Sequence, residues 1–297
     1  MILVEGTFDG KKYTEPFSKG VLSRSLTRAE VGITRSYEIA IKIESILEEK
    51  NITEITTDEL VGYIIAELEE EDPEIAEKYV AWRKIRKGKD PLIILIAGSS
   101  GIGTSSIAFE IANRLGIKNI IGTDMVREVM RKIISPELSP VIHESSYTAQ
   151  NVLRIPPPLD YDPTISGYKS HVETINVGVE AIIERSIKEG ISIVMEGVHL
   201  VPGFIRQDLM DRDNVVMFTL SLEDEEMHKG RLFSRCSGAG SERPLKRYLD
   251  NFDSIRKIQD YIIQQSRIYN VPIIENIVVI DTVYSMIKYI SKKYGEI

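Results

Sequence analysis

Residues 92–112 read LIILIAGSSGIGTSSIAFEIA and decide the fold of the larger part of this chain. An apolar run of strand length leads into a glycine-rich turn, and the turn leads into a helical pattern. In such a unit, consecutive backbone N–H groups and the N-terminus of the helix can converge on a phosphate. The spacing G-x-x-x-x-G is weak evidence alone, but the flanking strand and helix favour a nucleotide-binding loop over a structural turn.

This loop lacks the lysine that usually completes it. In the pattern G-x-x-x-x-G-K-[ST], the lysine reaches the β- and γ-phosphates and the hydroxyl binds Mg²⁺. Thr104 stands at the lysine position, while Ser105 keeps the hydroxyl. Losing one transition-state donor costs about 10²- to 10³-fold in rate, so either another cation reaches the phosphates or the loop binds without catalysing. The predicted nucleotide-binding residues are Gly98, Ser99, Ser100, Gly101, Ile102, Gly103, Thr104, Ser105 and Ser106.

The rest of the chain predicts two domains. Strand-like runs at 92–97, 119–122, 192–196, 214–220 and 273–280 alternate with helical patterns, which is typical of an α/β fold with a parallel sheet and crossover helices. Residues 1–88 instead predict a small, mostly helical domain. It begins with two short strands around Asp9-Gly10 and continues with helices near 36–47 and 57–68. A basic stretch at 83–91 suits a linker, so we expect domains at 1–88 and 89–297.

Composition narrows the class of protein. The 297 residues are 42% hydrophobic and 28% charged, as in an ordinary globular protein. The longest apolar run, 92–97, is far shorter than the roughly 18 to 20 residues that cross a bilayer. No secretory signal is visible at the N-terminus. We therefore expect a cytoplasmic protein that does not interact with membranes.

The cysteine content excludes disulfide and thiolate–metal chemistry, and the net charge gives no support to nucleic-acid binding. One cysteine, Cys236, excludes an internal disulfide and a thiolate metal cluster. The net charge of −8, from 37 basic and 45 acidic residues, gives no support to nucleic acid as a partner. Any anionic ligand must therefore be held by a local basic site.

A basic cluster between Lys229 and Arg247 offers candidates for the missing charge. Arg231 and Arg235 are four residues apart and so share a helix face. Glycines at 238 and 240 would let the segment hinge over a ligand. The segment therefore resembles a kinase lid, and the alternative is a solvated basic helix paired with the acidic run at 223–226.

Two acidic residues follow predicted strands, where parallel-sheet proteins bind their ligands. Asp124 could accept a proton from a substrate hydroxyl, or it could cap the following helix. Glu196 could orient magnesium or a water molecule, or simply be solvated at a strand end. Arg127 and Arg131 share a helix face and could fork onto a carboxylate or phosphate, with Lys169 as a weaker candidate for the same role.

Several ordered segments together resemble one family. AGSSGIGTSSIAFEIANRL, IIGTDMVREVMR, HESSYTA, VMEGVHLVPGF and the basic lid-like region are similar to the 2-phosphoglycerate kinase of methanogenic archaea. The N-terminal PFSKGVLSRSLTRA, which leads into a helical pair, resembles the ATP-cone module attached to that kinase. The resemblance covers nearly the whole chain.

The resemblance implies a P-loop kinase fold with an ATP-cone-like N-terminal domain. It implies a phosphotransferase that uses ATP and Mg²⁺ to phosphorylate the 3-hydroxyl of 2-phosphoglycerate, giving 2,3-bisphosphoglycerate on the way to cyclic 2,3-diphosphoglycerate. The loop would hold ATP phosphates, with Ser105 and Glu196 at the metal and Asp124 at the attacking hydroxyl. Arg231, Arg235 and Arg243 would close on the transferred group. The carboxylate and phosphate of the substrate would give Arg127, Arg131 and Lys169 something to bind.

Two departures from the patterns keep alternatives open. Besides Thr104, ATP-cones usually have a Lys-Arg pair before an Asp-Gly turn, whereas here Thr7-Phe8 precedes it. Lys11, Lys12 or Lys19 could compensate, or be ordinary surface lysines. The alternatives are a kinase for another small anionic hydroxy acid or sugar acid, and a nucleotide-sensing P-loop protein without catalysis.

Overall fold

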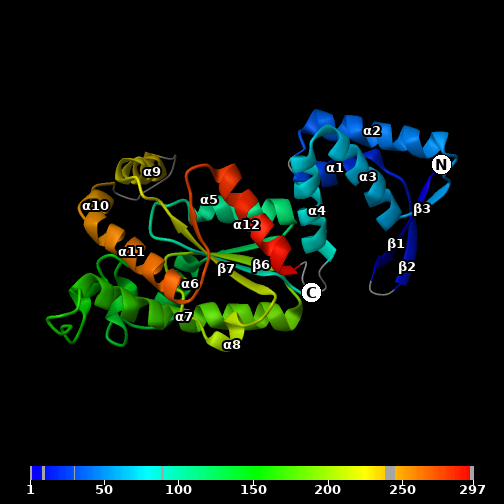
Figure 1. The fold of residues 1–297 in the computed structure, drawn as a ribbon. Helices are drawn as coiled ribbons and strands as arrows, with labels where there is room; N and C mark the ends of the chain where they lie inside the picture. Colours follow the sequence, from blue (N-terminus) through cyan, green and yellow to red (C-terminus); the bar gives the residue numbers. More distant parts are fainter. Residues whose placement is uncertain (1, 9–10, 30, 88–89, 238–244, 295–297) are drawn as a thin grey trace. The chain divides into compact units, whose positions relative to one another are not determined.

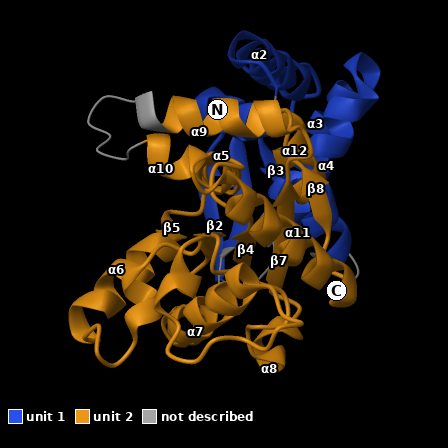
Figure 2. Ribbon diagram, turned by 90° about the vertical axis from the view of Figure 1, so that its left-hand side faces the viewer, with its two compact units in different colours: residues 1–87, 287–297 blue, residues 88–286 orange. Residues whose placement is uncertain are grey.

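The computed structural model describes residues 2–8, 11–29, 31–87, 90–237 and 245–294. The chain divides into two compact units. The first unit comprises residues 1–87 together with 287–297, and the second unit comprises residues 88–286 (Figure 2). Figure 1 identifies the helices and strands of each unit.

The second unit is built on a five-stranded parallel sheet. Its strands are β4 (Ile93–Ala97), β5 (Asn119–Gly122), β6 (Ile193–Gly197), β7 (Val215–Ser221) and β8 (Ile273–Glu275). Their order is β5-β6-β4-β7-β8, and every neighbouring pair is parallel. The predicted parallel α/β sheet is confirmed, but the strand expected at 273–280 is too long. It ends at Glu275, because the chain turns at the buried Asn276 and helix α12 begins at Val279.

Helices cover both faces of this sheet. Figure 1 shows α5 on one face and α7 with α11 on the other. The helices of the second unit and its short 3₁₀ turns are α5 (Thr104–Leu115), α6 (Thr123–Ile133), η1 (Pro140–His143), η2 (Ala149–Val152), α7 (Pro163–Glu189), α8 (Gln207–Met210), α9 (Glu225–Ser237), α10 (Leu245–Leu249), α11 (Phe252–Ile268) and α12 (Val279–Tyr294), whose last residues belong to the first unit.

Burial of both faces explains the uninterrupted apolar runs of the strands. All five residues of β4 are buried. Ile93, Leu95 and Ala97 join a core cluster with Tyr168 of α7 and Ile258 of α11. The alternate residues of the strand point to the opposite face, which α5 covers (Figure 1). A central strand covered on both faces has no polar face. The loop that follows β4 begins at the carboxyl end of this strand.

The first unit combines a small sheet with helices. Its strands, in the order β2-β1-β3, are β1 (Leu3–Phe8), antiparallel to β2 (Lys11–Pro16), and β3 (Glu54–Thr56), parallel to β1. The helices are α1 (Lys19–Arg28), α2 (Ile33–Glu49), α3 (Thr57–Glu71) and α4 (Pro73–Lys87). Thr56 and Glu59 form a capping box that begins α3.

The basic stretch expected as a linker at 83–91 is helical over its first half. Helix α4 continues to Lys87, and the strand β4 begins at Ile93. Arginine and lysine are good helix formers, so a basic run continues a helix as readily as it leaves one. Residues 287–297 group with the first compact unit.

Within the described residues, no helix combines the length and apolar character needed to span a bilayer.

Candidate active site

The glycine-rich loop joins the central strand β4 to helix α5. Gly101 and Gly103 have φ angles of 91° and 98°, in the left-handed region that favours glycine. Gly103 is also the N-cap residue of α5. Left-handed residues within a turn make successive N–H groups converge into an anion-binding nest, next to the positive end of a helix. The local geometry is that of a phosphate-binding loop.

The carbonyl groups of the loop are held by side chains from two other elements. His228 of α9 donates from Nε2 to the Ser100 carbonyl over 2.8 Å. Arg231, one helical turn further along α9, donates from Nη1 to the Ile102 carbonyl over 2.8 Å. Asn276, just after β8, donates from Nδ2 to the same carbonyl over 2.8 Å. In this structure Arg231 therefore lies against the loop backbone, whereas the sequence suggested a residue that closes on the transferred group.

Glu196 lies at the carboxyl end of β6, next to the loop. Its carboxylate accepts hydrogen bonds from Thr104 Oγ1 at 2.5 Å and from Ser105 Oγ at 3.0 Å. Parallel pairing of β6 with β4 brings the two motifs together, because it aligns Glu196 with Ile96, two residues before the loop. The sequence had grouped Ser105 and Glu196 as metal candidates, and the structure places them in direct contact.

The oxygen donors around Glu196 fit a magnesium site that water and substrate phosphates complete. They do not form a site in which the protein supplies every ligand. Mg²⁺ prefers oxygen ligands and commonly takes one or two from the protein, with the rest from water and substrate phosphates. A hydroxyl and a carboxylate beside a phosphate-binding loop supply this set. Among the residues described, no cluster of three or more His, Cys, Asp or Glu side chains could hold a metal without such help.

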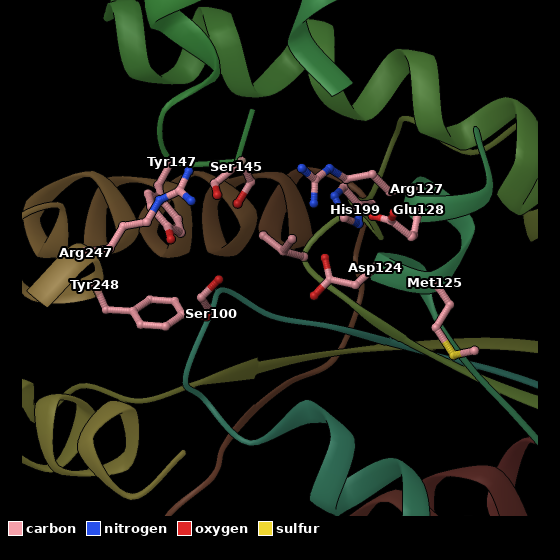
Figure 3. A pocket seen from close by; sticks show the side chains of 12 residues that line it. Ser100, Asp124, Met125, Arg127, Glu128, Ser145, Tyr147, His199, Arg247 and Tyr248 are labelled. Atoms are coloured by element: carbon pink, nitrogen blue, oxygen red, sulfur yellow. The ribbon is translucent and has the colours of Figure 1, made fainter. Parts of the chain in front are cut away.

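A cavity of about 410 Å³ opens beside the loop. It is lined by Ser100, Asp124, Met125, Arg127, Glu128, Ser145, Ser146, Tyr147, Val198, His199, Arg247 and Tyr248. In Figure 3 the Asp124 carboxylate points into the space between Ser100 and Arg127, while Met125 points away. Asp124 belongs to the first turn of α6, whose N-cap residue is Gly122, so its carboxylate lies both at the positive end of this helix and at the cavity.

Arg127 is fixed at the cavity wall by the main chain. Its Nε donates to the Ile142 carbonyl at 2.8 Å, and its Nη2 donates to the Glu144 carbonyl at 2.6 Å. Burial lowers the pKa of Arg127, although an arginine of this kind stays protonated. A half-buried, fully charged guanidinium with a fixed orientation is suited to bind a carboxylate or phosphate.

Arg247 is a second cation of the cavity that the sequence analysis did not single out. It comes from the short helix α10, and its Nη2 lies 3.9 Å from Oε2 of Glu144. Next to it, Tyr248 packs against Tyr147 with ring centroids 5.8 Å apart. Figure 3 shows Arg247 and Arg127 on either side of Ser145. The only sequence signal for Arg247 was its place in the basic cluster that ends there.

A chain of hydrogen bonds runs behind the cavity through two buried histidines. His171 Nδ1 lies 2.8 Å from the Val141 carbonyl, the two Nε2 atoms of His171 and His199 lie 3.0 Å apart, and His199 Nδ1 lies 2.7 Å from Thr123 Oγ1. A carbonyl only accepts, so His171 carries its proton on Nδ1. Its bare Nε2 then accepts from His199 Nε2–H, and His199 Nδ1 accepts from the Thr123 hydroxyl.

Both rings of this chain are neutral. Burial lowers the pKa of His199 to about 3, with the charge of Arg127 adding to the effect. Burial also lowers the pKa of His171 well below its ordinary value, as do the neighbouring His199 and Arg127. The chain joins Thr123, the residue before Asp124, to the η1 segment that also holds Arg127.

The other predicted residues lie away from this cavity. Arg131 donates from Nη1 to Glu128 Oε2 at 3.2 Å. Lys169 is half-buried on α7, and Arg235 is exposed on α9. None of the three lines the cavity. Arg243 lies outside the described residues.

In the first unit, two lysines that could compensate for the missing Lys-Arg pair have acidic partners. Lys12 pairs with Glu5, and Lys19 pairs with Glu44. Lys11 is exposed on β2, and the Asp9-Gly10 turn lies outside the described residues.

Comparison with known proteins agrees with this geometry. An ATP cone domain model matches residues 9–88. The 2-phosphoglycerate kinase of Methanothermobacter thermautotrophicus is 59% identical over 98% of this chain and 95% of its own length. That of Methanopyrus kandleri is 46% identical over 95% of this chain and 86% of its own length.

Among solved structures, a shikimate kinase from Acinetobacter baumannii in complex with shikimate covers 70% of this chain and 97% of its own, with a TM-score of 0.41 and 12% identity. That likeness is too distant to bear on activity. The resemblance inferred from the sequence segments is confirmed by the curated relatives. This chain belongs to the 2-phosphoglycerate kinase family.

Proposed function

We propose that this chain transfers the γ-phosphoryl group of ATP to the 3-hydroxyl of 2-phosphoglycerate, forming ADP and 2,3-bisphosphoglycerate. The observation that carries the proposal is the cavity beside the phosphate loop, where Asp124 shares the wall with Arg127 and Arg247. A carboxylate near two cations suits an acceptor with one hydroxyl and two anionic groups. Relatives named 2-phosphoglycerate kinase, at up to 59% identity, support this choice of acceptor.

On the donor side, the loop residues Gly98 to Ser106 bind the phosphates of ATP through main-chain N–H groups. Ser105 and Glu196, already in contact, hold Mg²⁺. When bound, Mg²⁺ neutralises charge on the phosphates. Phosphoryl transfer asks a protein mainly for positioning and charge neutralisation, which the loop and α5 provide without covalent chemistry.

On the acceptor side, Arg127 and Arg247 bind the phosphate and carboxylate of 2-phosphoglycerate. Two main-chain carbonyls fix the Arg127 guanidinium, so little side-chain entropy is lost when the ligand binds. Asp124 accepts the proton of the 3-hydroxyl as the oxygen attacks. These roles need a cavity for a small molecule, and one of about 410 Å³ is of that size.

The remaining predicted residues contribute charge in this proposal without contacting the acceptor. Arg235 and Arg243 add positive charge that favours the binding of ATP. Arg131 and Lys169 contribute to the positive field around the acceptor without contacting it. Substitution of any of these four by Ala is expected to matter less than substitution of Arg127 or Arg247.

The decisive experiment is a coupled assay of ADP release across acceptors. We expect turnover with 2-phosphoglycerate to exceed that with 3-phosphoglycerate, glycerate and gluconate, and to stop when EDTA removes Mg²⁺. Equal rates with all acceptors would favour a kinase for another hydroxy acid or sugar acid. ATP binding without ADP formation in the presence of every acceptor would favour a nucleotide sensor.

A further inference from the structure

The phosphate loop must obtain positive charge from a residue other than the one at position 104. Thr104 is neutral, and its hydroxyl is already committed to Glu196. Arg127 and Arg247 line the acceptor cavity, where they have anionic groups of their own to bind. A cation that contacts the loop is therefore the remaining source, a step that rests on the proposed function for the binding of ATP by the loop and of the acceptor by Arg127 and Arg247.

The peptide group between Ile102 and Gly103 is held by two side chains from outside the loop. Its carbonyl oxygen accepts two hydrogen bonds of 2.8 Å, one from the Arg231 guanidinium and one from the Asn276 amide. In a planar trans peptide, the N–H points away from the C=O. The N–H of Gly103 therefore points away from Arg231 and Asn276, and a full positive charge sits on the carbonyl side of the peptide.

The packing around this peptide is tight. A Cβ atom built on Gly103 would lie 2.9 Å from Asn276 Nδ2 and 3.7 Å from Arg231 Nη1. The second guanidinium nitrogen of Arg231 donates to the Ile277 carbonyl at 3.1 Å, so the group is held from both ends. Asn276 is buried and is itself fixed by the Thr282 hydroxyl at 3.1 Å. The guanidinium thus has a fixed orientation toward one carbonyl.

A neighbouring peptide of the loop has a matching but uncharged partner. The Ser100 carbonyl accepts from His228 Nε2, and the N–H of the same peptide belongs to Gly101. Burial lowers the pKa of His228, and Arg256 and Arg231 nearby act in the same direction. His228 is therefore a neutral donor, and the charge behind the loop comes from Arg231.

We infer that Arg231 replaces the missing lysine from behind the loop, by polarising the Ile102–Gly103 peptide so that the Gly103 N–H becomes a stronger donor to phosphate. Hydrogen bonds in series strengthen one another, and a charged donor at one end has the largest effect. Arg231 then acts as a positioning residue: its guanidinium serves the nucleotide without touching it. The same contact ties α9 to the loop.

Nucleotides with different numbers of phosphates test this inference. We would measure the dissociation constants of ATP and AMP by calorimetry for wild type, Arg231→Gln and Arg231→Lys, without any acceptor. A hydrogen bond strengthened by the bond behind it gains about 10–30% of its own strength, which for a charge-assisted bond is at most about 5-fold in an equilibrium constant. We expect Arg231→Gln to weaken ATP by that factor with little change for AMP, and Arg231→Lys to restore part of the loss. Equal weakening of ATP and AMP would overturn the inference, since it would place Arg231 at the nucleoside.

A double-mutant cycle with Thr104→Lys provides the second readout. Thr104→Lys restores the usual lysine, so the charge of Arg231 should then matter less. We expect Arg231→Gln to cost less ATP affinity in the Thr104→Lys background than in wild type. Identical costs in both backgrounds would show that the two positions do not share one role. Both measurements are made by binding alone, so they stand or fall independently of whether 2-phosphoglycerate is the acceptor.

Discussion

Mild acid should destabilise the second unit strongly, through the buried histidine chain. In the folded protein, Val141, His171, His199 and Thr123 are joined so that each ring has one donor and one acceptor nitrogen. A proton added to either ring would place a positive charge in a buried site near Arg127, and protonation of both rings would set two N–H donors against each other at 3.0 Å. In the unfolded chain both rings titrate with an ordinary pKa near 6.5.

The direction and size of the stability change follow from the difference in histidine pKa between the folded and the unfolded chain. Because the pKa values of both histidines are lowered on folding, the unfolded chain binds more protons below about pH 6.5, and stability falls as the pH falls toward about 3, the pKa of His199. Between about pH 7.5 and about pH 5, each ring that stays neutral costs about 2 kcal/mol. The pair together costs about 4 kcal/mol, a large part of the roughly 5 to 15 kcal/mol that stabilises a typical domain.

Urea unfolding at the two pH values measures the effect. Far-UV circular dichroism would follow the whole chain, and fluorescence of Trp82, the one tryptophan, would follow the first unit. All four histidines lie between residues 143 and 228, so the first unit has none and serves as an internal control. We expect the acid-induced loss in the circular dichroism transition and a Trp82 transition that moves little.

The variant His171→Asn separates proton linkage from packing. This variant lowers the free energy of unfolding at both pH values. It also leaves one histidine fewer that is kept neutral by folding, so the difference in the free energy of unfolding between about pH 7.5 and about pH 5 should shrink by about 2 kcal/mol. A pH difference identical to that of wild type would refute the argument, because the histidines would then not be the groups that titrate.

Four further substitutions test the site and the fold. Glu196→Gln should raise the Mg²⁺ concentration for half-maximal rate by about 10- to 100-fold, as loss of a metal-orienting partner commonly does, and an unchanged titration would contradict the metal assignment. Asp124→Asn should lower kcat by about 10²- to 10⁴-fold with the KM for ATP unchanged, and a normal kcat would exclude it as the base. Arg247→Ala should raise the KM for 2-phosphoglycerate by about 10-fold or more, while Arg185→Ala, exposed on α7, should have no effect; equal behaviour of the two variants would remove Arg247 from the site. Thr56→Ala breaks the capping box and should destabilise the first unit by about 1 kcal/mol, measured by Trp82 fluorescence, and an unchanged midpoint would show that the cap does not limit its stability.

The parts of the site that the sequence predicts are those encoded in contiguous residues. The loop and its flanking elements lie within residues 93–115, and their order along the chain determines their structure. The sequence also predicts that Glu196 lies near the loop, because the carboxyl ends of parallel strands meet at one edge of the sheet. Sequence alone, however, does not give the contact of Glu196 with the hydroxyls of Thr104 and Ser105.

The cavity could not be predicted in the same way. Its wall combines residues from α6, the segment at 145–147, the turn after β6 and helix α10. Arg247 differs from the other basic residues of its cluster only by where the chain brings it. The run IIENIVVI at 273–280 predicts one strand because it is apolar almost throughout, but the strand ends at Glu275, and the next residue, Asn276, donates to the Ile102 carbonyl of the loop.

The course of the chain also constrains how this protein can be divided. The first unit starts the polypeptide and also ends it: residues 287–297 return to it, Ile290 is fully buried, and Lys288 pairs with Glu77 at 2.9 Å. A fragment cut after residue 87 would therefore lack part of its own interior, and the complementary fragment would carry an orphaned amphipathic tail. A module exchanged between proteins would therefore have to carry both the N-terminal segment and the residues from 287 onward.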